Sequence, residues 1–216
     1  MRNEGGAGLA TLLALADSRL PIGGHVHSGG VEEAVASGLV RDTASVELYL
    51  RRRIATSGLV AASLAAAVCA ATMTPERAEL EADARTPSPA ARTASRAQGR
   101  GLLRLAKQLW PHHEWALVGA RPHLSTVFGM VGRACGATPE QLAGVVVYTT
   151  LTGAATAAQR LLALDPAAIA DGTVRLAPLC DRIAAEAVTG PAALSDPVQD
   201  AMAQRHLDRD MPLFAS

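Results

Sequence analysis

Apolar residues recur at intervals of three and four along most of the chain, which is typical of helices that bury one face. This spacing places Val46, Leu50 and Ile54 on one side of a predicted helix. The segment 140–151 carries more apolar residues than one helical face can hold, so we expect a central, buried helix there. Alternation of apolar and polar positions, the signal of a strand, is faint and confined to 173–176.

Helix starts are marked by a capping side chain, in most cases followed by proline. The oxygen of Ser, Thr or Asp accepts a free amide of the first turn, and proline suits the first helical position because its missing N–H would have no partner there. Asp42 can cap the segment after Arg41 in the same way. The cap–proline pairs are Thr74–Pro75, Thr138–Pro139, Asp165–Pro166 and Asp196–Pro197. These marks predict an all-α fold, a single compact domain over residues 1–216 with about eight to ten helices and short loops.

Two features interrupt this regular pattern. The segment 83–95 is the best candidate for a longer loop, because Pro87 and Pro89 are excluded from a helix interior. Gly99 and Gly101 fall in the middle of a predicted helix, where each costs about 1 kcal/mol relative to alanine. We expect a close helix contact or a kink at these two glycines.

Composition limits the possible partners. The chain has 20 basic and 20 acidic residues, so its formal net charge of zero gives no general attraction to nucleic acid or to an anionic membrane. Alanine is abundant and aromatic residues make up only 3%, which favours extensive helix–helix contacts, including contacts with other chains. Two uncharged segments, 54–75 and 141–159, are long enough to cross a membrane. Because they consist mainly of small residues, we interpret them as buried helices of a soluble protein.

The cysteines and the N-terminus indicate a cytoplasmic protein. Cys69, Cys135 and Cys180 are widely separated and odd in number, with no disulfide pattern, which fits a reducing compartment. The first ten residues lack the apolar core of a signal peptide.

The stretch 15–32, LADSRLPIGGHVHSGGVE, admits three interpretations: a nucleotide loop, a metal site or a structural turn. A phosphate-binding loop requires a nearby lysine, and the only lysine in the chain is Lys107. His25 and His27 could bind a metal, but the other histidines make no H-x-x-x-H pair with a carboxylate and no cysteine pair assists, so no stable site is completed. A turn with locally packed histidines is therefore favoured, and we expect neither a metal site nor a cofactor. No catalytic acid, base or nucleophile stands out, so we expect no enzymatic activity.

Four arginines, the first of them within the predicted loop, recur every four residues. On a helix they would form one arginine stripe, where like charges repel by a few tenths of a kcal/mol per pair. One interpretation is a solvated face; the other is a docking surface for an acidic partner or phosphate. Nucleic-acid binding is less favoured because no aromatic residue or lysine is interleaved. The stripe consists of Arg92, Arg96, Arg100 and Arg104.

Several motifs, in order along the chain, resemble the UreF family of urease accessory proteins. The N-terminal stretch is similar to the family signature L-P-x-G-G-F-x-x-S-x-G-L-E, and it matches at Leu20, Pro21, Gly23, Gly24, Ser28, Gly30 and Glu32. A second match, to S-x-x-Q-G-R-x-L-L, falls at Ser95, Gln98, Gly99, Arg100, Leu102 and Leu103. The similarity continues through the helix of Tyr148, the segment 157–164 and the closing PLFAS, and so extends over essentially the whole chain.

The chain departs from the family pattern at a few positions. His25 stands where the family usually has Phe, and His27 where it often has Tyr. Asp165 and Pro166 replace a Pro-Leu-Gly-Gln continuation that many relatives carry. These differences affect how subunits pack together rather than the general role. Aromatic residues at the two histidine positions in the family also point to shape and packing rather than to metal binding.

The resemblance implies an all-helical, non-catalytic scaffold that dimerises and bridges UreD (also called UreH) and the nickel-carrying GTPase UreG. Such an assembly engages apo-urease and helps deliver nickel to it. By resemblance and inference, the residues expected to bind partners are Pro21, Gly23, Gly24, Ser28, Glu32, Arg96, Gln98, Arg100 and Tyr148. No nucleic acid or membrane is expected among the partners. The alternative hypothesis is a small all-α nucleic-acid-binding regulator that uses the arginine stripe.

Overall fold

The structure is a computed structural model that describes residues 6–22, 27–206 and 213–214. Within these ranges the chain forms ten α-helices and no strand, which confirms the all-α prediction. The helices are α1 (Leu9–Leu15), α2 (Val31–Ala36), α3 (Thr43–Arg53), α4 (Leu59–Cys69), α5 (Pro75–Ala84), α6 (Pro89–Leu109), α7 (Leu124–Cys135), α8 (Pro139–Leu162), α9 (Pro166–Ala187) and α10 (Pro197–His206).

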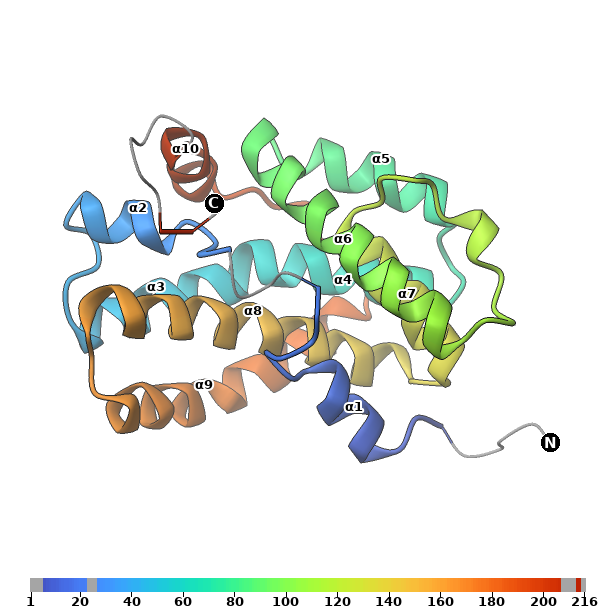
Figure 1. Cartoon of the computed structure of the whole chain (residues 1–216), viewed down its shortest axis with the longest axis horizontal. Helices are drawn as coiled ribbons and strands as arrows, with labels where there is room; N and C mark the ends of the chain where they lie inside the picture. Colours follow the sequence, from blue (N-terminus) through green and yellow to red (C-terminus); the bar gives the residue numbers. More distant parts are fainter. Residues whose placement is uncertain (1–5, 23–26, 207–212, 215–216) are drawn as a thin grey trace.

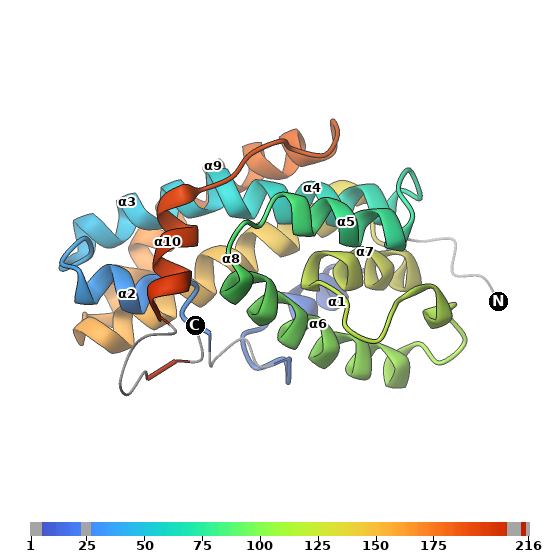
Figure 2. The same cartoon turned by 90° about the horizontal axis from the view of Figure 1, so that it is seen from above.

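The core is built around α4 and α8, which pack against each other (Figure 1). α9 lies along α8 and also contacts α4, while α7 covers another side of α4 and carries α6 on its outer side (Figures 1 and 2). Ala65 of α4, Phe128 of α7 and Leu151 of α8 are almost fully buried members of the main hydrophobic core. The prediction of a central helix over 140–151 is therefore confirmed, and Val46, Leu50 and Ile54 are buried as expected.

Side-chain caps set the helix boundaries. Asp42 and Thr138 each form a reciprocal capping box, with Ser45 and Gln141 respectively. The Ser88 hydroxyl accepts the amide of Ala91 and starts α6, with Pro89 in the first turn. The predicted loop over 83–95 is therefore wrong in extent: it runs only from the end of α5 to Ser88, because Pro89 sits where proline is tolerated.

Two further segments differ in detail from expectation. The faint strand at 173–176 lies inside α9, because four residues are too few to separate alternation from helical spacing. α3 and α4 join through one π-helical turn, Ile54–Gly58, into a continuous helix over Thr43–Cys69. This is the only helix in the described part of the chain that is long and apolar enough to cross a membrane. Because 56% of its most apolar window is buried within the protein, we interpret it as the core helix of a soluble domain.

The two mid-helix glycines of α6 mark close backbone contacts, as expected. A Cβ atom at Gly99 would lie 2.2 Å from the carbonyl oxygen of Pro122, just before α7. A Cβ atom at Gly101 would lie 2.9 Å from the Cα of Ile22, in the loop that follows α1. α6 therefore touches both α7 and the N-terminal signature through positions that have room only for hydrogen.

Candidate functional site

The N-terminal signature lies between α6 and the C-terminal part of the chain. Pro21 is exposed, whereas Ser28 is 1% exposed, and its hydroxyl accepts the amide of Glu32 at 3.4 Å. Ser28 thus satisfies an amide of α2, although Gly30, rather than Ser28, is the N-cap residue. Gly23, Gly24 and His25 lie outside the described residues.

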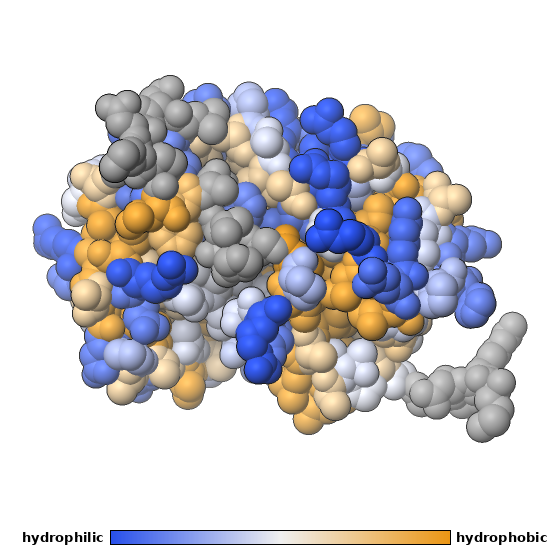
Figure 3. All heavy atoms as spheres, viewed as in Figure 1, coloured by the Kyte–Doolittle hydropathy of each residue, from blue (hydrophilic) through white to orange (hydrophobic). Residues whose placement is uncertain are grey.

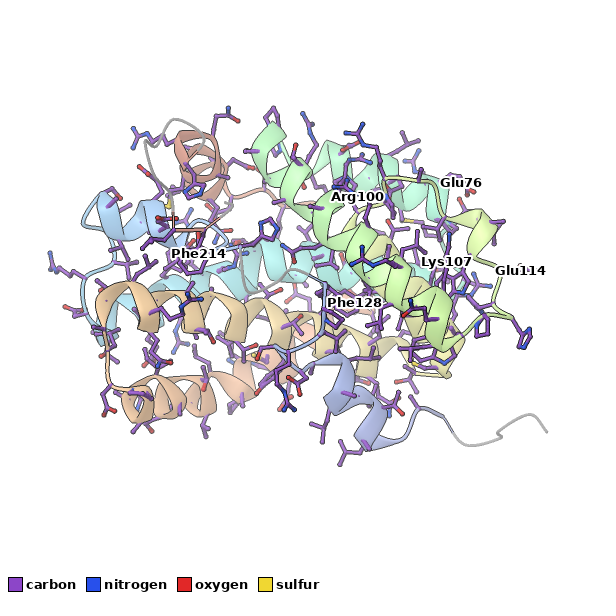
Figure 4. The ribbon with its side chains drawn as sticks, viewed as in Figure 1. Glu76, Arg100, Lys107, Glu114, Phe128 and Phe214 are labelled. Atoms are coloured by element: carbon purple, nitrogen blue, oxygen red, sulfur yellow. The ribbon has the colours of Figure 1, made fainter. Side chains whose placement is uncertain are left out.

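Glu32 is a buried carboxylate that holds the C-terminal residues. Its two oxygens accept the backbone amides of Leu213 at 2.8 Å and Phe214 at 3.1 Å. Phe214 is labelled in Figure 4. His206 Nε2 lies 3.0 Å from the carbonyl oxygen of Phe214, and the Arg160 guanidinium lies over the Phe214 ring at 5.3 Å. Glu32 is only 4% exposed. Its hydrogen bonds lie within the chain, and a direct role in partner binding stays a prediction.

A second buried polar group joins α5, α6 and α7 around His123. Its Nδ1 lies 3.0 Å from the hydroxyl oxygen of Ser95, and its Nε2 lies 2.9 Å from Oδ1 of Asp83. The amide of Leu124, the first residue of α7, donates to the same Ser95 oxygen at 3.2 Å. This pattern is satisfied when Ser95 donates to Nδ1 and Nε2–H donates to the carboxylate of Asp83.

No pattern in the sequence indicated that a serine, a histidine and an aspartate would meet. The arrangement has the order of a hydrolytic triad, but His123 is only 1% exposed, and the Ser95 oxygen already receives the first amide of α7. Glu79 accepts the amide of His123 itself at 2.8 Å, which adds another link to α5. We therefore interpret the group as the connection that fastens the start of α7 to α5 and α6.

The Asp83 carboxylate of this network makes the stability of the folded state vary with pH in the acid range. Burial raises the pKa of Asp83, but the hydrogen bonds from His123 and Arg96 outweigh it, so the pKa of Asp83 lies below its ordinary value of 3.8. Because the folded state holds this proton less tightly, the contribution of Asp83 is complete above pH of about 3.8 and is lost as pH falls through the lowered pKa.

We expect Asp83→Asn to be less stable than the wild type at neutral pH, with a difference that shrinks as the pH falls below the ordinary pKa of Asp83. Urea unfolding at several pH values down to about 2.5 would measure it. Asp181→Asn is the matched control, because Asp181 is exposed and makes no ion pair within the described ranges; its effect should stay within about 0.5 kcal/mol at every pH. If the difference in unfolding free energy between Asp83→Asn and the wild type stays constant with pH, the lowered pKa of Asp83 is contradicted.

The structure divides the arginine stripe into two parts. Arg96 is half-buried and pairs with Asp83 at 2.8 Å and Glu79 at 3.2 Å, and it also donates to the carbonyl oxygen of Arg121. Arg92 lies 4.0 Å from Asp83. Arg100 and Arg104, one and two turns further on, are exposed and pair with no carboxylate in the described residues. The first half of the stripe is therefore structural, and the second half is free to face a partner.

The remaining predicted positions are dispersed. Gln98 and the half-buried His27 line a cavity of about 400 Å³ that is also bordered by Ile22, Phe128 and Phe214. Tyr148 is on the exposed side of α8, with 48% of its surface accessible. The described residues contain no group of three or more His, Cys, Asp or Glu side chains that could hold a metal ion.

Comparison with known proteins identifies the family. A family model described as UreF matches residues 40–177. The chain belongs to the UreF family. Three relatives, each named urease accessory protein UreF, agree with this. The protein of Mycobacterium sp. (strain JLS) is 65% identical over 208 residues, that of Mycolicibacterium vanbaalenii 63% over 211, and that of Mycobacterium bovis (strain BCG / Pasteur 1173P2) 57% over 208. Each alignment covers 96% of this chain and 99% of the relative.

Membership in the UreF family confirms the resemblance that the motifs suggested, and it favours urease maturation over a nucleic-acid-binding regulator. The motifs also contain three residues of the polar contacts described above. Glu32 closes the first motif, Ser95 opens the second, and Phe214 belongs to the closing one. The UreF motifs thus marked these residues, but their partners are far away in the sequence and became visible only in the fold.

Proposed function

We propose that this protein is a non-catalytic scaffold of urease maturation that binds UreD and the GTPase UreG and helps deliver nickel to apo-urease. The observation that carries the proposal is identity of 57–65% to proteins named urease accessory protein UreF, over 96% of this chain. A scaffold role is consistent with the position of the polar groups, since Asp83, Ser95 and His123 connect helices to one another.

The scaffold acts in the cytoplasm as a homodimer. Support for self-association comes from large apolar side chains left on the surface. Leu9 and Leu13 of α1 are 71% and 62% exposed, and hydrophobic side chains gather at the lower edge of the face in Figure 3, where α1 lies. Leu48 of α3 and Val174 of α9 are 68% and 71% exposed. Neighbouring exposed apolar side chains, such as the pair on α1, commonly mark contacts with other chains.

Reconstitution of urease activation tests the proposal. Apo-urease, UreD, UreG, GTP and limiting nickel are mixed with and without this protein, and urease activity is followed. We expect activation to depend on the protein, and we expect the isolated protein to turn over neither GTP nor ATP. Light scattering should show a dimer that forms larger complexes with UreD and then UreG. The proposed function would be disproved by equal urease activation without the protein, or by a monomer that binds neither UreD nor UreG.

A further inference from the structure

Three exposed cations form a basic ridge on the outer face of α6. Arg100, Arg104 and Lys107 follow one another at intervals of four and three residues, so they share one face over about 10 Å of helix. Figure 4 shows Arg100 and Lys107 along α6, and Figure 3 shows hydrophilic side chains following the same diagonal. We refer to these three residues as the basic ridge.

The ridge carries positive charge that the described part of the molecule does not neutralise. α6 contains no acidic residue, and Glu79 and Asp83 of α5 are engaged by Arg96 and His123. No carboxylate in the described ranges pairs with a ridge residue. The whole chain has equal numbers of acidic and basic residues, so the ridge is a local excess rather than a reflection of general charge.

A shallow depression of about 600 Å³ adjoins the end of the ridge at Lys107. Its lining is mainly apolar and includes Pro111, Trp115 and Leu117, together with Glu114. The indole N–H of Trp115 donates to the carbonyl oxygen of Trp110 at 2.7 Å, and the ring of His113 packs against its edge. Trp115 is therefore fixed in place, whereas Leu117 is 40% exposed. A fixed aromatic wall beside an accessible leucine can receive an apolar side chain.

We propose that the basic ridge and this depression together form a docking surface for an acidic segment of a partner protein. Carboxylates of the segment pair with Arg100, Arg104 and Lys107, and one apolar side chain enters the depression beside Trp115. Protein interfaces combine an apolar anchor with a charged rim in this way, and arginine is enriched in them. The ridge is too short and lacks the exposed stacking aromatics that a nucleic-acid groove uses.

The inference deepens the proposed function, since it assigns one surface of the scaffold to one of its partners. Binding of UreD, of UreG and of apo-urease to the wild type is measured first by surface plasmon resonance. Arg100→Glu with Arg104→Glu is then compared with Arg41→Glu with Arg182→Glu. The control makes the same change in charge at exposed arginines of other elements. Circular dichroism and light scattering establish that both variants are folded and assembled as the wild type is.

We expect the ridge variant to bind one partner roughly tenfold more weakly or worse, with a smaller dependence on salt, because screening acts on the exposed pairs that it removes. Arg100→Lys with Arg104→Lys, which keeps the charge, should restore most of the binding. Leu117→Ser should weaken binding of the same partner without changing how that binding depends on salt.

Two results would overturn the inference and leave the proposed function intact. In the first, the ridge variant binds every partner as the wild type does, or the control variant loses binding equally. In the second, the ridge variant loses binding to a duplex DNA probe and keeps its binding to the proteins. Absence of wild-type binding to all three proteins would overturn the proposed function, and the inference with it.

Discussion

Gly99→Ala is expected to cost about 3 kcal/mol of unfolding free energy, at the upper end of the range for overpacking. The added methyl group would lie 2.2 Å from the carbonyl oxygen of Pro122 and 2.9 Å from the carbonyl carbon of His123. Both atoms belong to the backbone just before α7, so a rotamer change cannot relieve the clash. Relief requires moving α6 away from α7, which would also stretch the hydrogen bonds of Ser95. Urea denaturation followed by circular dichroism measures the loss.

Gly153→Ala is the matched control, because Gly153 also lies inside a long helix, but a methyl group added there would meet no atom of another element within 4 Å. The better helix propensity of alanine should therefore dominate and stabilise the protein by about 0.5–1 kcal/mol. The two substitutions are chemically identical and are expected to have opposite signs. If both change stability by less than about 0.5 kcal/mol, the close packing of α6 on α7 is wrong.

Arg96→Glu is expected to cost about 2–3 kcal/mol, below the roughly 3–5 kcal/mol for breaking a fully buried pair, because the side chains of Arg96, Glu79 and Asp83 are 22–39% exposed. The new carboxylate would face Glu79 and Asp83, which the guanidinium now neutralises, and the carbonyl oxygen of Arg121 would lose its donor. Urea unfolding should show a lower midpoint with little change in slope. Low salt should enlarge the effect, because the three carboxylates then repel more strongly.

The adjacent member of the stripe supplies the comparison. Arg100→Glu changes the same residue type on the same helix, but Arg100 is exposed and unpaired within the described ranges, so its effect should stay within about 0.5 kcal/mol. Equal costs for the two substitutions would contradict the division of the stripe. A variant that replaces both Arg96 and Arg100 could not separate an effect on partner binding from an effect on folding. It would remove the ion pairs of Arg96 and change the exposed charge at Arg100 at the same time.

Local features of this fold were predictable from the sequence because their causes are local. Asp42, Thr74 and Thr138 lie next to the helices that they cap, and the apolar content of 140–151 is itself the reason for the burial of α8. Pro89 was misjudged because the exclusion of proline from a helix interior does not apply to the first turn. Its neighbour Ser88 was the missing signal.

The buried polar groups were not predictable, since their partners are distant in sequence and follow no period. His123 is 28 residues from Ser95 and 40 from Asp83, and it occupies a segment without a recognisable motif. The arginine stripe posed a different difficulty. Arg96 and Arg100 look equivalent in a helical pattern, and only the position of α5 shows that one is paired while the other is exposed.

The clamp of Glu32 on Leu213 and Phe214 has a consequence for synthesis on the ribosome. Glu32 and Leu213 are 181 residues apart, so at ordinary elongation rates the carboxylate is made roughly 10–40 s before the amides that it binds. During that interval α2 carries a charge that the finished fold buries, and its burial would be costly without those donors. Glu32 can therefore reach its buried, fully bonded state only after Leu213 and Phe214 have been made, and a nascent chain that stops before them leaves the end of the N-terminal signature without these donors.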